Sequence, residues 1–248
     1  MRRTLRAGCS GWHYRHWRGA FYPQDARPAQ WFAHYAATFD TVELNNSFYR
    51  LPSEQAIRSW SQEAPPAFCF ALKASRLITH FRRLEGVATA LGVFFERVRL
   101  LGEALGPILY QLPPDFERND RRLDDFLSLL PPDLTHVFEF RHQSWWHSRV
   151  YERLEAAGAV FCMYDRGASS TPAVATAPDV YLRMHGPAGD YAGTYSDDAL
   201  RRWVHRLSEL RWQRAWVYFN NDGGAAAPRD AVRLRELWET GTTPRDPQ

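Results

Sequence analysis

Short apolar runs recur along the chain and alternate with stretches whose apolar residues have helical spacing. This alternation of strand-like and helix-like segments is typical of a parallel α/β sheet. Eight such runs can be distinguished. They are RAGCSG near residue 8, TVELN from Thr41, FCFALK from Phe68, PILYQL from Pro107, HVFEFR from His136, VFCMYD from Val160, VYLRMH from Val180 and WVYFNN from Trp216.

The stretches between these runs carry apolar residues three and four positions apart, which places them on one helical face. The predicted stripes are Trp31–Phe39, Val87–Leu105, Leu200–Leu210 and Val232–Trp238, with shorter helices centred near Trp60, Phe126 and Leu154. Gly158 and Ser196 occupy positions expected for a helix C-terminal and N-terminal cap. The segment between Asp165 and Asp179 has turn residues and no helical stripe, so a loop is expected there.

Eight strands and 248 residues predict a single (β/α)8 TIM-like barrel, α/β in class, with an irregular loop in place of a regular helix after strand 6. The domain is expected to span residues 1–248, with its core at about residues 5–240. The polar segment 241–248 is expected to be a frayed tail.

Strand periodicity sorts the side chains of such a barrel, because alternate residues point inward. Inward parity collects a ring of polar residues toward the carboxyl ends of the strands, the end at which barrels of this kind place their active sites. The ring comprises Glu43, Asn45, Lys73, Gln111, Glu139, Arg141, Arg183, His185 and Asn220. Burying unpaired charges costs several kcal/mol, so this ring predicts a functional site. A structural alternative pairs Glu43 with Lys73, and Glu139 with Arg141 or Arg183.

Three chemistries fit this ring. Arg141, Arg183 and Lys73 could hold a phosphate or carboxylate. Glu43, Glu139 or His185 would then act as general acid or base. A small anionic ligand is therefore the favoured partner. Glu43, Glu139, Asp165 and His185 could instead bind a divalent metal for a phosphoesterase or isomerase, although the interleaved cations disfavour it. Lys73 could also act as a Schiff-base lysine. No cofactor is favoured, and no metal ligand is assigned.

Two loops interleave aromatic and basic residues. SGWHYRHWRGAFYP follows the first strand and RHQSWWH the fifth; Trp12 and Trp145 are their candidate stacking residues. Such rings could stack a base, so a nucleic-acid-binding or processing barrel using the loops around Trp12 and Arg76 is the second hypothesis. The same rings could simply pack over the barrel end.

Charge and cysteine content bear on the expected partners and cellular compartment of the protein. The net charge of +3 gives no strong steering toward nucleic acid or an anionic membrane. Cys9, Cys69 and Cys162 are widely spaced in apolar runs and are expected to be reduced, buried thiols. No apolar stretch is long enough for a signal peptide or a membrane span. A cytoplasmic protein without a membrane partner is expected.

Several segments together resemble the YecE-like family, known as domain of unknown function 72. They are GCSGWHYRHWRGAFYP, TVELNNSFYRLP, FCFALKASRLITHFRRL, LGPILYQLPPDF, VFEFRHQSWW, VYLRMHG with Tyr191 and Tyr195 beyond it, and VYFNND. The resemblance runs from about Gly8 to Leu237 and implies a TIM-like barrel. It implies no activity. It adds Asn46, Tyr49, Asn221 and Asp222 to the residues expected to line the site formed by the polar ring.

Overall fold

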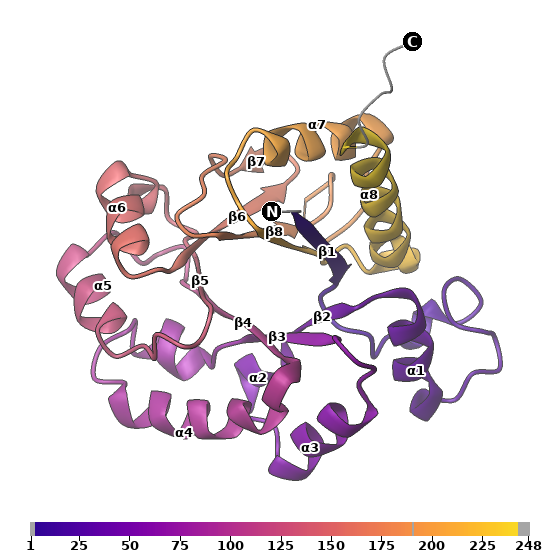
Figure 1. The fold of residues 1–248 in the computed structure, drawn as a ribbon, viewed down its shortest axis with the longest axis horizontal. Helices are drawn as coiled ribbons and strands as arrows, with labels where there is room; N and C mark the ends of the chain where they lie inside the picture. The colour runs from indigo at the N-terminus through magenta and orange to yellow at the C-terminus, as the bar shows by residue number, and fades with distance from the viewer. Residues whose placement is uncertain (1–2, 190, 243–248) are drawn as a thin grey trace.

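The protein is a parallel eight-stranded barrel surrounded by helices, as seen in a computed structural model that describes residues 3–189 and 191–242 (Figure 1). All eight predicted strands form. They are β1 (Thr4–Cys9), β2 (Thr41–Leu44), β3 (Cys69–Lys73), β4 (Leu105–Gln111), β5 (His136–Glu139), β6 (Val160–Arg166), β8 (Asp179–Met184) and β9 (Arg214–Phe219). The (β/α)8 prediction is confirmed.

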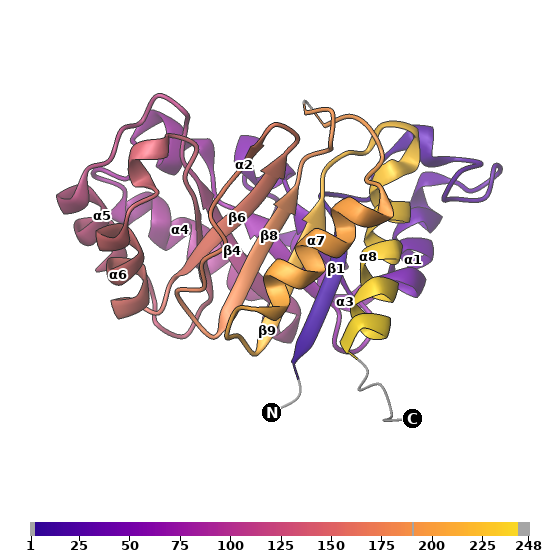
Figure 2. The ribbon, with the colours of Figure 1, turned by 90° about the horizontal axis from the view of Figure 1, so that it is seen from above.

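The strands are hydrogen-bonded in the order β1-β9-β8-β6-β5-β4-β3-β2, and these pairs are parallel. Figure 2 shows them side-on, running from the end near the N-terminus toward the end where the connecting loops and α2 lie. All carboxyl ends therefore meet on one face of the barrel, which we call the mouth. Within the described part of the chain, no helix is long and apolar enough to cross a membrane.

The helices follow the predicted stripes. They are α1 (Pro28–Thr38), α2 (Asn46–Tyr49), α3 (Glu54–Glu63), α4 (Ala88–Val98), α5 (Asp120–Leu127), α6 (Ser148–Ala156), α7 (Asp197–Ser208) and α8 (Ala226–Thr242). The caps form as expected: Gly158 has a φ of 65°, and the Ser196 side chain accepts from the backbone N–H of Ala199. Each cap marks where a helical stripe ends or begins.

Three boundaries differ from the sequence prediction. The stripe predicted from Val87 to Leu105 is α4 followed by a 3₁₀ segment (Arg99–Ala104) that bends at Gly102, and Leu105 already begins β4. The loop after β6 contains a two-residue strand, β7 (Ser169–Ser170), antiparallel to β6. The predicted tail starts too early, because residues 241 and 242 belong to α8; residues 243–248 lie outside the described part.

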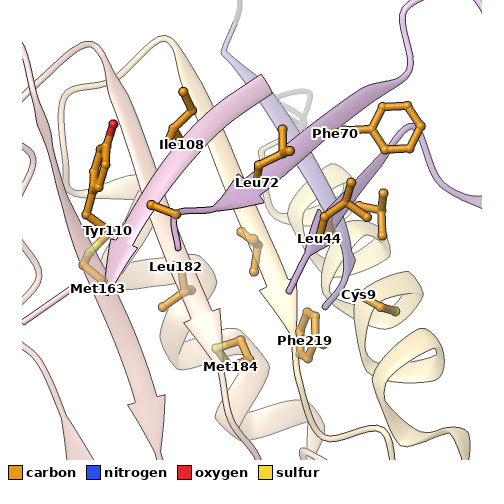
Figure 3. Packing of buried hydrophobic residues seen from close by; sticks show 14 of the residues in the cluster. Cys9, Leu44, Phe70, Leu72, Ile108, Tyr110, Met163, Leu182, Met184 and Phe219 are labelled. Carbon is orange, nitrogen blue, oxygen red and sulfur yellow. The ribbon is translucent and has the colours of Figure 1, made fainter. Parts of the chain in front are cut away.

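Strand alternation divides the core into two layers. The outward layer packs between strands and helices and includes Phe70, Leu72, Leu182 and Met184, which Figure 3 shows at alternate positions of β3 and β8. The inward layer fills the barrel below the mouth with Ala71, Leu109, Val137, Val160, Cys162, Tyr181, Trp216 and Tyr218. The inward polar ring therefore rests on a packed floor. All three cysteines are free thiols, but Cys69 is half-buried rather than fully buried.

A tyrosine joins the two end strands of the ladder, β1 and β2. The buried hydroxyl of Tyr35 accepts from the Cys9 backbone N–H at 2.8 Å and donates to the Thr41 carbonyl oxygen at 2.9 Å. Glycine is required at position 8 in this seam between β1 and β2, because a Cβ atom there would lie 2.3 Å from the Thr41 carbonyl oxygen. One side chain thus satisfies backbone groups on both sides of the closure.

We expect Tyr35→Phe to reduce the free energy of unfolding by about 1–3 kcal/mol, because it leaves a buried donor and a buried acceptor unpaired. Tyr151→Phe is the matched control, since the Tyr151 hydroxyl is buried without a hydrogen-bond partner among the described residues. Urea unfolding of both variants provides the measurement. Equal stability of the two would show that the hydroxyl does not hold the seam.

Candidate functional site

The polar ring predicted from strand parity is assembled at the mouth around Arg183. This guanidinium is 1% exposed, and it lies between two carboxylates that are fully buried. Its Nε and Nη2 donate to the two oxygens of Glu43 at 2.9 and 2.7 Å, and its Nη1 donates to Glu139 at 2.7 Å. Arg183, on β8, therefore ties β2 to β5 across the barrel.

Glu43 is fully supplied with donors. Besides Arg183, the hydroxyls of Ser10 and Tyr181 donate to it at 2.7 Å each, and the Asn45 amide donates at 3.3 Å. Burial raises the pKa of this carboxyl, but the charge and hydrogen bonds of Arg183, with those of Tyr181 and Ser10, outweigh burial and lower it. Glu43 is therefore ionised at neutral pH.

Glu139 connects Arg183 to a second arm of the ring. Burial raises the pKa of its carboxyl, whereas the neighbouring charges of Arg141 and Arg183 bring it well below the ordinary value. Arg141 forms an ion pair with Glu139 through Nε, and its side chain is 8% exposed. Its guanidinium carbon also lies 4.7 Å from the centroid of the Tyr164 ring. Within residues 3–189 and 191–242, the Nη1 atom of Arg141 has no hydrogen-bond partner.

His185 is a neutral acceptor in this arm. Its Nε2 atom lies 2.9 Å from Nη2 of Arg141, and a guanidinium can only donate. The other ring nitrogen, Nδ1, lies 3.3 Å from the side-chain amide nitrogen of Asn220. Burial lowers the pKa of His185 to about 4, which agrees with a neutral ring. As a neutral imidazole, His185 orients Arg141.

Lys73 is the one ring cation that pairs with no carboxylate among the described residues. Its Nζ donates to Gln111 at 2.6 Å and lies 4.1 Å from the centroid of the Phe48 ring. Burial and the charge of Arg183 lower the pKa of Lys73 to about 7. The pairing of Glu43 with Lys73, expected in the structural alternative, is wrong, because Arg183 reaches both carboxylates and occupies them.

A cavity of about 400 Å³ opens beside Glu43, at the carboxyl ends of β1 and β2. It is lined by Ser10, Gly11, Trp12, His13, Tyr14, Leu44, Asn45, Asn46 and Trp60. Ser10 and Asn45 both donate to Glu43, so they separate the cavity from the buried ion pairs. A molecule in this cavity would meet aromatic walls and a polar edge next to the ring.

Trp145, a candidate stacking residue, is not exposed at the mouth. Its ring is fully buried, stacks on Phe140 at 4.7 Å, and donates through Nε1 to the Phe116 carbonyl oxygen at 2.6 Å. Trp12 is 6% exposed, lines the cavity and packs on Phe32. Of the two alternatives for these loops, packing over the barrel end describes Trp145.

Two further predicted residues hold loops. The Tyr195 hydroxyl donates to Asp165 at 3.0 Å and accepts from the Gly186 backbone N–H. The Asn221 amide donates to the Gly193 carbonyl oxygen and to Asp230. Both are buried. Their visible role is to fix the segment between β8 and α7 over the mouth.

The remaining predicted residues lie nearer the surface. The exposed Asn46 lines the cavity, Tyr49 is 68% exposed, and the Tyr191 ring lies 5.4 Å from that of His185. The half-buried Asp222 accepts through its backbone carbonyl from Trp17 Nε1. Of these residues, Tyr191 makes an aromatic contact with a member of the ring, His185.

The metal alternative loses one proposed ligand. Asp165 accepts from Tyr195 and from Trp203 Nε1 of α7, so its carboxylate faces the helical layer instead of the ring. Glu43 and Glu139 are engaged by arginines. Across the residues that the structure describes, no group of three His, Cys, Asp or Glu side chains is placed to hold a metal ion.

Sequence reasoning missed three residues that shape the ring. Tyr181 has the same inward parity as Arg183, so periodicity alone could have included it. Ser10 comes directly after β1, where its parity was less clear. Phe48 reaches Lys73 from α2, and no pattern along the strands could have indicated that contact.

The fold and ring define a TIM-like barrel with a mixed-charge mouth. Residues 6–248 match the family described as "Protein of unknown function DUF72", so the chain belongs to that family. The resemblance noted from the sequence is thus confirmed.

Relatives and solved structures agree. The chain is 26% identical to the UPF0759 protein YunF of Bacillus subtilis, over 96% of this chain and 97% of that protein. It is 29% identical to the UPF0759 protein YecE of Escherichia coli K12 over 45% of this chain and 42% of that protein. The crystal structure of a DUF72 family protein from Thermotoga maritima is similar, with a TM-score of 0.85 and 27% identity, covering 95% and 99% of the two chains. A second, from Enterococcus faecalis, shares the fold at a TM-score of 0.82 and 17% identity, covering 99% and 100%.

Proposed function

We propose that the mouth binds a small anionic ligand, phosphorylated or carboxylated, and that the protein acts on it as an enzyme. The observation that carries this proposal is the charge balance of the ring. Arg183 forms ion pairs with both Glu43 and Glu139, and Arg141 forms a second ion pair with Glu139. Lys73 has no carboxylate partner in the described chain. Three cations against two carboxylates give the ring one positive charge whenever Lys73 is protonated.

Two groups are suited to contact the anion. Arg141 has an unengaged Nη1, and Lys73 is half-buried with only Gln111 as its hydrogen-bond partner among the described residues. Arg141 is also close enough to Lys73 to lower the pKa of that amine. An anion between them would relieve this repulsion. Both carboxylates are ionised, and His185 is neutral, so proton transfer in this proposal falls to Lys73 or to His185.

We expect thermal unfolding to shift upward with a phosphate, sugar phosphate, nucleotide or carboxylate that binds the mouth. At about one hundred times its dissociation constant, a ligand adds about 2.7 kcal/mol of stability. Arg141→Met and Lys73→Met should each reduce the shift, whereas Arg121→Met, at a side chain 92% exposed on α5, should keep it. If no anion stabilises the protein, or if all three variants respond alike, the proposal fails.

A second candidate function rests on an exposed cluster at the mouth. Arg76 lies 5.7 Å from the Tyr49 ring and 5.3 Å from the Phe81 ring, and both rings are about two-thirds exposed, at 68% and 67%. Exposed aromatics beside a cation suit single-stranded nucleic acid. Binding of a short oligonucleotide that weakens steeply with salt, and that Arg76→Met weakens, would favour this function. Salt-independent binding would count against it.

A further inference from the structure

Lys73 is the single lysine of the chain. The sequence contains 31 lysine and arginine residues, and every one except Lys73 is an arginine. Apart from two histidine contacts, the ion pairs in the described part of the chain use guanidinium groups, including those of Arg141 and Arg183 in the ring. The lone amine is therefore found at the mouth, on the last residue of β3.

A lysine amine can become neutral in a protein, which an arginine guanidinium does not. Arginine keeps its proton at any ordinary pH, whereas a lysine in an unfavourable setting loses its proton and becomes a nucleophile. A position that required only positive charge could be filled by arginine, as it is elsewhere in this chain. Lys73 thus carries the one side-chain amine of the protein, and only an amine can form an imine with a carbonyl compound.

The surroundings of Lys73 favour the neutral amine. The charged groups that act on it are Arg183 and Arg141, which oppose its charge, and Glu139 and Glu43, which support it. His80 packs edge-on against Phe48 and is itself subject to the charge of Lys73. Both carboxylates are already bound by arginines, so burial and Arg183 prevail. Because the pKa falls to about 7, a far larger fraction of the amine is neutral at pH 7 than in an ordinary lysine, where that fraction is roughly one part in a thousand or less.

We propose that Lys73 is a nucleophile that forms an imine with the carbonyl carbon of a small anionic oxo compound. Gln111 and the Phe48 face hold Nζ in place, and Arg141 binds the carboxylate or phosphate of the ligand. This inference rests on the proposed function and narrows it to oxo acids and phosphorylated aldehydes or ketones.

The step balances without an oxidant or a cofactor. The neutral Nζ attacks the carbonyl carbon, a C–N bond forms, and the carbonyl electron pair moves to oxygen, which takes up the proton released from nitrogen. The carbinolamine then loses water to give the imine. Protonation of the imine restores the positive charge that the ammonium form of Lys73 contributed to the ring.

Reductive trapping tests the inference directly, because Lys73 is the only lysine. The full chain is incubated with glyoxylate or pyruvate and cyanoborohydride at pH 7, and peptide mass mapping locates the secondary amine. The same experiment on Arg121→Lys places an ordinary, exposed lysine in the same molecule as a reference. We expect Lys73 to react at least about tenfold faster than the lysine introduced at position 121, given the difference in neutral fraction.

Two variants separate nucleophile from anion binding. Lys73→Arg, which keeps the charge, should give no adduct in the β3 peptide while its far-ultraviolet circular dichroism stays unchanged. Arg141→Met should lose the preference for glyoxylate over propanal. The ratio of the two trapping rates is the measure, because removing the charge of Arg141 also raises the pKa of Lys73 and slows both reactions. If circular dichroism shows that Lys73→Arg is misfolded, the Arg121→Lys comparison alone decides.

The outcomes distinguish this inference from the function on which it rests. If anions raise the melting temperature but Lys73 reacts no faster than the introduced lysine, the imine is wrong and anion binding stands. If Lys73 traps propanal and glyoxylate equally well and no anion stabilises the protein, the anionic substrate class is wrong. Fast, Arg141-dependent trapping of the oxo acid supports both.

Discussion

Replacing Arg183 by methionine will lower the free energy of unfolding by about 3–5 kcal/mol at neutral pH, because it leaves two buried carboxylates without their shared cation. Arg183 donates from all three of its nitrogens to Glu43 and Glu139, both fully buried. Arg183 is 1% exposed, and three of its five N–H groups are engaged by these carboxylates, so this variant measures chiefly the stability of the ring. Chemical unfolding monitored by tryptophan fluorescence gives the number.

The pH dependence of this loss identifies its cause. In the wild type the lowered pKa values of Glu43 and Glu139 stabilise the fold above about pH 4.3, and that contribution is lost as pH falls below it. Without Arg183, Glu43 keeps only neutral hydrogen-bond donors, so burial raises its pKa, whereas Glu139 keeps its ion pair with Arg141. Through Glu43, the variant therefore gains stability as pH falls from neutral toward about 4.3. The difference between the proteins should therefore shrink on acidification.

Arg99→Met is the matched control for Arg183→Met. Arg99 also holds a carboxylate, Asp133, with two nitrogens, at 2.7 and 2.9 Å, but on the exposed surface. Water replaces such a pair readily, so its loss should be much smaller and should not shrink toward pH 4.3. If Arg183→Met were as mild as Arg99→Met, the carboxylates would not depend on the arginine.

The polar ring was predictable because a strand has a period of two. Glu43, Lys73, Glu139 and Arg183 each stand between apolar neighbours that face the helices, so parity sends them inward without any knowledge of the fold's details. Parallel strands then bring their carboxyl ends to one face. The register of eight parallel strands is therefore enough to place these four residues together.

The partners within the ring were not predictable, because pairing depends on the reach of side chains across the barrel. Glu43 could meet Lys73 on the neighbouring strand or Arg183 on a strand further round, and the sequence allowed both. The longer, forked side chain of Arg183 spans to Glu43 and Glu139 at once. Because Arg183 pairs with both carboxylates, Lys73 is left with Gln111 as its hydrogen-bond partner. The amine chemistry proposed above depends on this pairing.

The tryptophans show a different limit. The sequence pattern around a tryptophan that follows a strand is the same whether the ring packs in the core or stacks on a ligand. Both uses place an aromatic residue beside polar residues. Trp145 lies in a 3₁₀ turn (Gln143–Trp145) after β5. It packs on Phe140, close by in the sequence, and on Phe116, which is 29 residues away. Only tertiary contacts reveal that it belongs to the core.

Trp145→Ala should consequently destabilise the fold by about 3–5 kcal/mol, because it empties a fully buried site. It also leaves the Phe116 carbonyl oxygen without the Nε1 donor 2.6 Å away. Trp145→Phe should cost less, since it keeps an aromatic ring on Phe140. Unfolding in urea measures both changes.

The same variant distinguishes the two interpretations of Trp145. If its ring stacked on a ligand at the mouth, Trp145→Ala would keep near wild-type stability and lose the stabilisation by anions. If its ring packs in the core, stability falls in the absence of ligand. Any surviving folded protein still responds to anions unless the connection between β5 and α6, which carries both Arg141 and Trp145, shifts. Trp146→Ala, at the half-buried neighbour whose Nε1 donates to the Phe140 carbonyl oxygen at 3.2 Å, controls for such a shift.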